Sequence, residues 1–304
     1  MDLLPGDLAV QSVSTAKKAH RWLSGDILAY EEHMGTSVQQ LFFLNVMSGV
    51  LTKEPELLAS RFRWAPAGEP VAGRWLGGPA GFWVWDRQAG YLRRSLESGE
   101  VFEAWSPDGQ ELLYTEWHCP TPYCPQGAST LWRLDLATGR RQQVAQNAGL
   151  AAWSAAGQIA YVQFGESLEL VVTDSETGSR LWVQKLGARP KEVEHRWDLY
   201  RPQFEGGSLA FTNAQGDWLL SRAESKAVHH IYRGGESRLI WSPGGQHLAI
   251  LGGRERPRLL VLENPLSEEP TPAMACDAPA AATSGGGWSR TGTSNRLIGR
   301  EPAQ

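Results

Sequence analysis

The sequence predicts an all-β fold, a β-propeller with six four-stranded blades, from three observations. First, 14 Trp and 33 Gly among 304 residues favour short strands joined by tight turns, because aromatic rings pack on pleated sheets and glycine adopts positive φ freely. Second, one motif recurs along the chain at a blade-like spacing. Third, no segment sustains the 3.6-residue apolar period that helices between parallel strands would require.

The repeated motif is a tryptophan followed by a turn sequence. Trp105-Ser106-Pro107-Asp108-Gly109 is matched by Trp241-Ser242-Pro243-Gly244-Gly245. Including worn copies, the repeats start at Trp22, Trp64, Trp105, Trp153, Phe204 and Trp241. Their spacing runs from 37 residues (204 to 241) to 51 residues (153 to 204), which is typical of a four-stranded propeller blade.

Each repeat supplies the same series of elements. The anchor should end the innermost strand and pack between neighbouring blades. A short apolar strand follows the turn in most repeats, at 27–30, 112–114, 159–162, 209–211 and 248–251. A third strand then ends in a second turn, over 41–49, 82–90, 131–139, 170–178, 218–225 and 259–267. The best second turns read Asp-x-x-Thr-Gly, in which Asp caps the turn and Gly takes the left-handed position.

The motif residues are expected to be structural. Proline fixes φ and glycine supplies positive φ in a tight turn. The position of Asp108 is occupied by Ala67, Ala156 and Gly244 in sister turns. A catalytic residue would be unique to one blade, so Asp108 is interpreted as a turn residue.

Trp-Ser-Pro-Asp-Gly-Gln followed by Leu-x-x-x-Asp-x-x-Thr-Gly resembles the WD40-like (PD40) repeat of the TolB-like propeller family. The same repeat occurs in the propellers of prolyl-oligopeptidase-type peptidases. The resemblance covers about residues 20 to 300 and implies a ring of six or seven blades, usually a protein-binding scaffold. Its motif residues specify the fold and carry no information about a reaction.

One domain is expected over residues 1–304. Trp288 starts a partial repeat that does not finish. It would close the ring by pairing with residues 8–22, since propellers remove their open sheet edges in this way. The alternative is that it forms the inner half of a seventh blade.

Composition limits the function. A net charge of −4 argues against a nucleic-acid or anionic-membrane partner. No apolar run of 18 residues predicts a membrane span, and Met1–Val13 lacks the pattern of a signal peptide. A cytoplasmic monomer is expected, with a periplasmic or secreted protein as the alternative if a leader is missing. Cys119 and Cys124 are expected to be free or locally paired, depending on the compartment.

No catalytic motif is present. The sequence lacks Gly-x-Ser-x-Gly, a P-loop and His-Glu-x-x-His, so no catalytic residue, metal or cofactor is predicted. His229 and His230 are adjacent in a predicted strand, where they would face opposite sides and could not share an ion.

Two insertions mark the face opposite the Ser-Pro-Asp-Gly turns. One spans 116–130 and the other 186–203, and both connections open on the same side of a propeller. They contain aromatic and arginine side chains of the kind enriched at interface hot spots. The predicted binding residues are Trp117, Tyr123, Arg196, Trp197, Tyr200 and Arg201.

Two functions follow from this pattern. The first is a non-catalytic scaffold that binds a protein or peptide on the face that carries the insertions. The alternative is a hydrolase or lyase acting on a carbohydrate or peptide in the central funnel. Loop packing without any ligand would also explain the aromatic residues.

Overall fold

The computed structural model describes residues 17–24, 26–33, 39–59, 62–66, 71–74, 81–86, 91–94, 99–118, 129–188, 201–205, 207–222, 227–233, 237–242, 245–252, 258–263, 265–266 and 271–277. Their regular structure is entirely β, in six four-stranded sheets. In this part of the chain no helix is long and apolar enough to span a membrane.

The sheets are numbered in chain order. Sheet 1 holds β1 (Lys17–Ser24), β2 (Ile27–His33), β3 (Gln39–Asn45) and β4 (Leu51–Ala59). Sheet 2 holds β5 (Phe62–Trp64), β6 (Val71–Arg74), β7 (Phe82–Asp86) and β8 (Tyr91–Arg94). Sheet 3 holds β9 (Glu100–Trp105), β10 (Glu111–Trp117), β11 (Ser129–Asp135) and β12 (Arg141–Gln146).

Sheets 4 to 6 continue the series. Sheet 4 holds β13 (Ala148–Trp153), β14 (Gln158–Phe164), β15 (Ser167–Asp174) and β16 (Arg180–Ala188). Sheet 5 holds β17 (Gln203–Glu205), β18 (Ser208–Thr212), β19 (Trp218–Arg222) and β20 (Val228–Tyr232). Sheet 6 holds β21 (Ser237–Trp241), β22 (His247–Gly252), β23 (Arg258–Glu263) and β24 (Thr271–Asp277).

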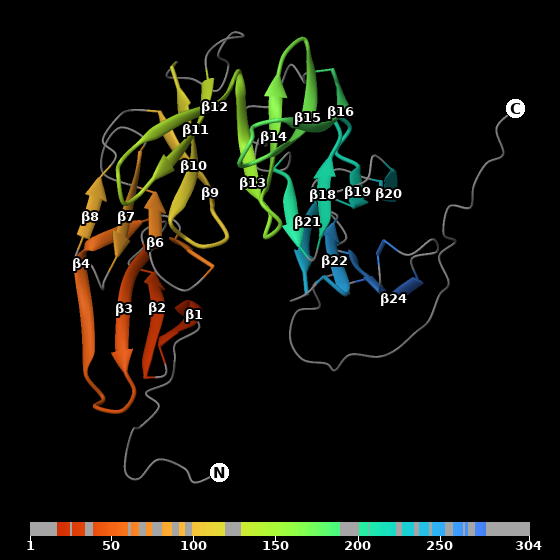
Figure 1. Ribbon diagram of the computed structural model, residues 1–304. Coiled ribbons are helices and arrows are strands. Elements are labelled where there is room, and N and C mark those ends of the chain that lie inside the picture. The colour runs from red at the N-terminus through yellow and green to blue at the C-terminus, as the bar shows by residue number, and fades with distance from the viewer. Residues whose placement is uncertain are drawn as a thin grey trace, which may run out of the picture.

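Every sheet is an antiparallel meander of four consecutive strands. Figure 1 shows the sheets following one another along an arc, from sheet 1 at the lower left to sheet 6 at the lower right. The all-β prediction is confirmed. Within the described residues each sheet is built from one continuous stretch of chain, so closure by the chain ends stays a prediction.

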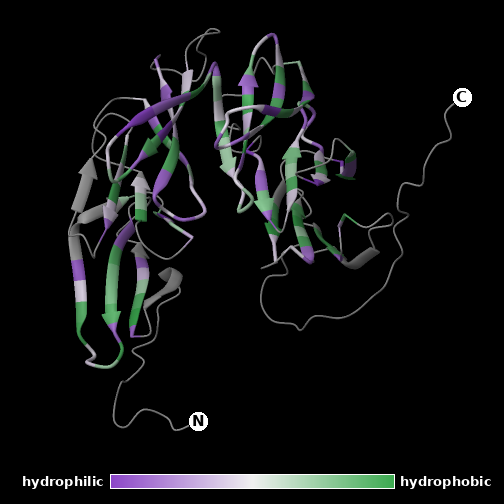
Figure 2. Ribbon diagram, viewed as in Figure 1, coloured by the Kyte–Doolittle hydropathy of each residue, from purple (hydrophilic) through white to green (hydrophobic). Residues whose placement is uncertain are grey.

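The core lies between successive sheets. Five apolar clusters each join one sheet to the next along the chain. Members of these clusters, one pair per junction, are Leu41 and Trp83, Ala72 and Leu112, Leu131 and Tyr161, Val162 and Phe211, and Ala210 and Leu248. Figure 2 shows hydrophobic residues along the strands at these junctions. Each inner sheet therefore has two apolar faces, which is how a stacked repeat buries its core.

The anchor tryptophan packs between sheets, as predicted. Trp105 ends β9 and is almost fully buried. Its indole N–H donates a 2.8 Å hydrogen bond to the carbonyl of Arg63 on β5. This bond satisfies the one polar group of a buried ring.

The Ser-Pro-Asp-Gly turn is held by its own side chains. Asp108 accepts hydrogen bonds from the Ser106 hydroxyl at 2.6 Å and from the Gln110 N–H at 3.0 Å. Gly109 has φ of 73°. The Ser106 hydrogen bond is the main cause that lowers the pKa of Asp108. The structural interpretation of Asp108 is therefore confirmed.

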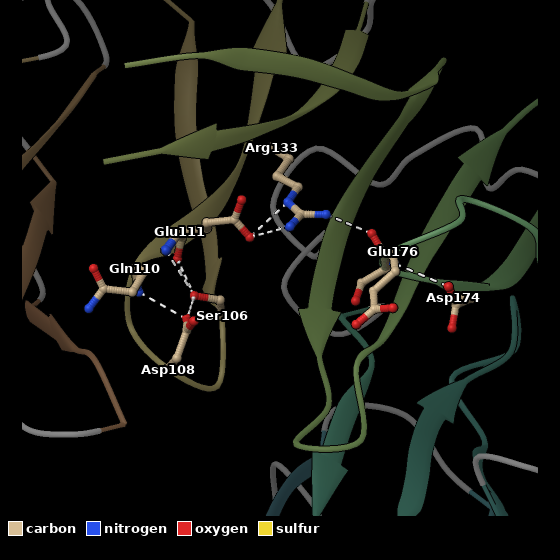
Figure 3. A network of polar contacts seen from close by, with 8 residues as sticks. Ser106, Asp108, Gln110, Glu111, Arg133, Asp174 and Glu176 are labelled. Carbon is tan, nitrogen blue, oxygen red and sulfur yellow. Dashed lines mark hydrogen bonds and ion pairs between the residues drawn. The ribbon is translucent and has the colours of Figure 1, made fainter. Parts of the chain in front are cut away.

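Arg133 links this turn region to sheet 4 (Figure 3). Its guanidinium binds Glu111 at 2.5 and 2.8 Å and donates to the Ser175 carbonyl at 2.6 Å. It also lies 5.2 Å from the ring centroid of the Trp153 anchor. One side chain thus connects the turns of two neighbouring sheets.

The second turn type is also as predicted. Asp174 accepts the N–H groups of Glu176 and Thr177 at 3.1 and 2.7 Å. Asp135 accepts the Thr138 N–H at 2.9 Å. Gly139 and Gly178 have φ of 73° and 70°, which a side chain would strain.

Both insertions are shorter than the sequence suggested. Glu116 and Trp117 pair with Thr130 and Ser129, so β10 and β11 continue into the range expected to be a loop. β16 likewise extends to Ala188 and β17 begins at Gln203. Glu116, Thr130 and Gly187 interrupt the apolar pattern of these strands, which is why the strand ends were expected to be loop.

Candidate functional site

Two of the six predicted binding residues lie in the described part of the chain. Trp117 is the last residue of β10 and is partly exposed. Its backbone N–H donates a 3.0 Å hydrogen bond to the carbonyl of Gly99, just before β9 begins. Its ring packs against Phe164 of sheet 4 with centroids 5.6 Å apart. Tyr123, Arg196, Trp197 and Tyr200 lie outside the described residues.

Arg201 precedes β17 and forms an ion pair with Glu103 on β9. The same guanidinium nitrogen approaches the carbonyls of Glu103 and Ala151, at 3.2 and 3.5 Å. The Arg201 side chain is 23% exposed and that of Glu103 is 2% exposed. These contacts make Arg201 a link between sheets. A binding role for it stays a prediction.

Glu103 is the centre of this site. Its second carboxylate oxygen accepts the Thr115 hydroxyl at 2.7 Å and the Leu150 N–H at 3.2 Å. A buried carboxylate is costly unless it is paired and hydrogen-bonded. Glu103 meets both conditions through groups on sheets 3 and 4 and the segment that enters sheet 5.

The backbone of β13 is irregular where it meets Glu103. Leu150 and Asn147 have φ of 53° and 51°, and the register between β13 and β14 shifts between Gly149 and Ala152. A left-handed conformation costs a residue such as Leu150 roughly 1–2 kcal/mol, whereas Asn147 adopts it more readily. Such outliers cluster at functional sites. This bulge points the Leu150 N–H at the carboxylate.

A second polar cluster lies beside the first insertion. Arg141 binds Glu100 at 3.3 Å and Glu116 at 3.4 Å. Glu116 also accepts the Trp132 indole N–H at 2.7 Å. The guanidinium carbon lies 5.2 and 5.1 Å from the ring centroids of Tyr114 and Trp132. Burial raises the pKa of Tyr114.

His118 marks the edge of the described chain at this insertion. Its Nε2 lies 3.1 Å from the Thr130 hydroxyl and its Nδ1 lies 3.8 Å from Glu116. Among the residues that the structure describes, no three His, Cys, Asp or Glu side chains are arranged to hold a metal ion. The three carboxylates named above bind arginine, so their observed role is to hold sheet 3 together and join it to its neighbours.

The sequence carried a signal for Glu103 that the repeat motif concealed. Two residues before the anchor, three of the five other copies have the buried residues Phe62, Ala151 and Leu239, and the remaining two have His20 and Pro202. A carboxylate at this apolar position must find a partner. The partner Arg201 is 98 residues away, and no local pattern identifies it.

Comparison with solved structures gives the fold. A prolyl endopeptidase structure aligns with 87% of this chain and 42% of its own, at 16% identity and a TM-score of 0.56. Prolyl oligopeptidase B from Galerina marginata, bound to a 35mer substrate, aligns with 86% and 44%, at 12% identity and a TM-score of 0.55. The β-propeller domain of the Trilobed protease from Pyrococcus furiosus aligns with 84% and 69%, at 11% identity and a TM-score of 0.44.

The first two similarities support a β-propeller fold for this chain. The chain spans less than half the length of these two peptidase chains. No protein-family profile and no curated protein matches the sequence. The TolB-like assignment therefore stays a prediction.

Proposed function

We propose that this chain is a six-bladed propeller scaffold of the TolB-like type that binds a protein or peptide on the face where the two insertions emerge. The observation that carries the proposal is that three acidic side chains of sheet 3 are already paired with arginine. Glu100, Glu103 and Glu116 are each bound to an arginine. Their contacts support a rigid rim, and the partly exposed Trp117 lies on it.

A rigid rim suits recognition. Interfaces depend on a few anchored aromatic and arginine side chains whose conformations are fixed before binding. The ion pair between Glu103 and Arg201 joins β9 to the residues that lead from the second insertion into β17. Arg141 contacts β10 and β11, the strands that flank the first insertion. The proposed contact residues are Trp117, Tyr123, Arg196, Trp197, Tyr200 and Arg201.

The test uses the purified chain as bait with matched variants. Trp197→Ala with Tyr200→Ala should abolish capture of a partner that the unmodified chain captures, without lowering the melting temperature. Met47→Ser is the control, because Met47 is 81% exposed on a hairpin at the opposite end of the strands. Arg201→Ala is a poor probe, since it also breaks the ion pair with Glu103. Equal capture by all three proteins would contradict the proposal.

The alternative is a hydrolase or lyase with a site in the central funnel. The similarity to prolyl peptidases that contain a propeller supports it as well as it supports a scaffold. Incubating the chain with a fluorogenic proline-containing peptide tests the peptidase form of this alternative. The scaffold proposal expects no turnover above buffer.

A further inference from the structure

Three exposed apolar side chains lie together at the turn between β3 and β4. Met47, Val50 and Leu51 are 81%, 58% and 52% exposed. Figure 2 shows hydrophobic colouring at this turn, at the lower end of sheet 1. A group of apolar side chains that the described chain leaves in water indicates a contact surface.

The turn carries no charge, unlike the equivalent turn of every other sheet. Residues 46–50, between β3 and β4, read Val-Met-Ser-Gly-Val. In sheets 2 to 6 the segment between the third and fourth strands always contains a charged residue. These residues include, one per sheet, Arg87, Arg140, Glu176, Glu224 and Glu268. The repeat therefore does not require an apolar turn, and sheet 1 departs from it.

The positions on either side of the turn follow the same pattern. Asn45 caps the turn where sheets 3 and 4 have Asp135 and Asp174. Hydrogen bonds from backbone N–H groups of their turns lower the pKa of both aspartates, so these two caps are charged at neutral pH. Leu51 is the first residue of β4, whereas β12 begins with Arg141. The tip of sheet 1 thus has uncharged groups at positions that are charged in its sister turns.

The backbone of this turn can leave water without losing hydrogen bonds from its N–H groups. Each backbone N–H from residue 45 to residue 50 donates a hydrogen bond within sheet 1 and its turns. The acceptors, in order along the chain, are the Val50 carbonyl, the Asp26 carbonyl, the Asn45 side-chain oxygen for two successive residues, the Asn45 carbonyl and the Ser48 hydroxyl. A medium without water demands that backbone groups be satisfied internally in this way.

Charged groups mark the base of the tip. The Asp26 carboxylate accepts a 3.1 Å hydrogen bond from the Asn45 amide. Lys53 lies two residues after Leu51 on β4 and is exposed. A charged side chain is costly in hydrocarbon, so only residues 46–51 can leave water. This length suits insertion at a membrane surface and is too short for a span.

We infer that the tip formed by residues 46–51 inserts into the surface of a lipid layer with zwitterionic headgroups. A turn at the end of two strands is convex (Figure 1), and lipid accepts a convex apolar group without a matching pocket. The net charge of −4 gives no general attraction to anionic headgroups. A single short apolar anchor of this kind binds reversibly.

The tip and the first insertion lie at opposite ends of their sheets. The tip joins a third strand to a fourth, whereas the first insertion joins a second strand to a third. Contact of the tip with lipid would therefore leave the insertion face accessible. The inference does not depend on whether that face binds a partner.

The first test is flotation with vesicles of phosphatidylcholine. Met47→Glu, Val50→Ser and Leu51→Arg together give the tip the residues of the sheet 4 turn. This triple variant should reduce the fraction of protein that floats by about fivefold or more. Leu181→Ser is the control, because Leu181 is 41% exposed on the outer strand of sheet 4, and it should float like the unmodified chain. Equal flotation of all three proteins would overturn the inference, as would binding that requires anionic lipid and is abolished by high salt.

The second test reports the surroundings of the tip and does not depend on how the triple variant folds. An environment-sensitive fluorophore is attached to Ser48→Cys in a chain whose Cys119, Cys124 and Cys276 are changed to serine. Phosphatidylcholine vesicles should shift its emission to the blue, and a quencher on the acyl chains should quench it. The same label at Leu181→Cys should show neither effect. A blue shift that needs no vesicles and grows with protein concentration would assign the tip to a second copy, and no shift at all would show that lipid does not receive it. Either result overturns the inference.

Discussion

Glu103 shows how one residue fixes the relation between three sheets. The carboxylate is almost completely buried, yet it contacts Arg201, Thr115 and the Leu150 N–H. Burying a charge is unfavourable, so the loss of any of these contacts would leave Glu103 incompletely satisfied and destabilise the fold. The sequence predicted Arg201 as a ligand contact because arginine is common at interfaces. The sequence could not show that Arg201 already forms an ion pair with Glu103, far away along the chain.

Glu103→Gln should therefore destabilise the protein. The change leaves the Arg201 guanidinium without its counter-ion, and the expected loss is about 2 kcal/mol in the free energy of unfolding, reduced from the cost of a fully buried pair because Arg201 is partly exposed. Glu176→Gln is the matched control on an exposed turn and should change it by no more than about 0.5 kcal/mol. Urea denaturation measures both. A Glu103→Gln midpoint equal to that of the control would show that the pair does not stabilise the fold.

The acid sensitivity of one turn is also predictable. The hydrogen bond from the Thr177 N–H is the largest cause that lowers the pKa of Asp174 below its ordinary value of 3.8. Because the pKa of Asp174 is lower in the folded state, the stabilisation from its ionised form is fully present above the ordinary value of 3.8. It is lost as the pH falls from there through the folded-state pKa. Asn45 caps the equivalent turn of sheet 1 through its side-chain oxygen, at 3.0 and 2.9 Å from the Met47 and Ser48 nitrogens. An uncharged side chain can therefore cap this type of turn.

Asp174→Asn should accordingly fold normally at neutral pH and lose less stability than the unmodified protein as pH falls below 3.8. Thermal melts at a series of pH values give the comparison. Parallel pH profiles for the two proteins would rule out this contribution.

The turns and strands are the elements that the sequence predicted best. Ser106, Asp108 and Gly109 act locally, so their chemistry can be derived from a few neighbouring letters. The third strands were also placed correctly, since β11 and β15 end at the predicted capping residues Asp135 and Asp174. The Arg141 cluster was missed because its members come from four different strands, and only the strand register brings them together.

The anchor tryptophans offer a matched test of an inter-sheet hydrogen bond. The Trp105 N–H binds a carbonyl of the preceding sheet, whereas the Trp241 N–H is buried without a partner among the described residues. Trp105→Phe should lose about 1 kcal/mol more than Trp241→Phe, the contribution of one hydrogen bond. Chemical denaturation of both variants measures the difference. A larger loss at Trp241 would contradict the anchor role assigned to the Trp105 hydrogen bond.

At the scale of the whole molecule, the repeat predicted the architecture and not the function. Propeller blades have no separate cores, because each apolar cluster belongs to two sheets. The repeat residues therefore specify packing, while the proposed recognition would involve the insertions, which follow no repeat. This division explains why the fold could be predicted from the sequence and the function could not.

Because each apolar cluster is shared by two successive sheets, we expect the six sheets to unfold as one cooperative unit. Differential scanning calorimetry of the full chain tests it most directly. A single transition is expected, with the calorimetric enthalpy equal to the van't Hoff enthalpy. Two separated transitions, or independent folding of a fragment that ends at Gln146 after sheet 3, would contradict the claim.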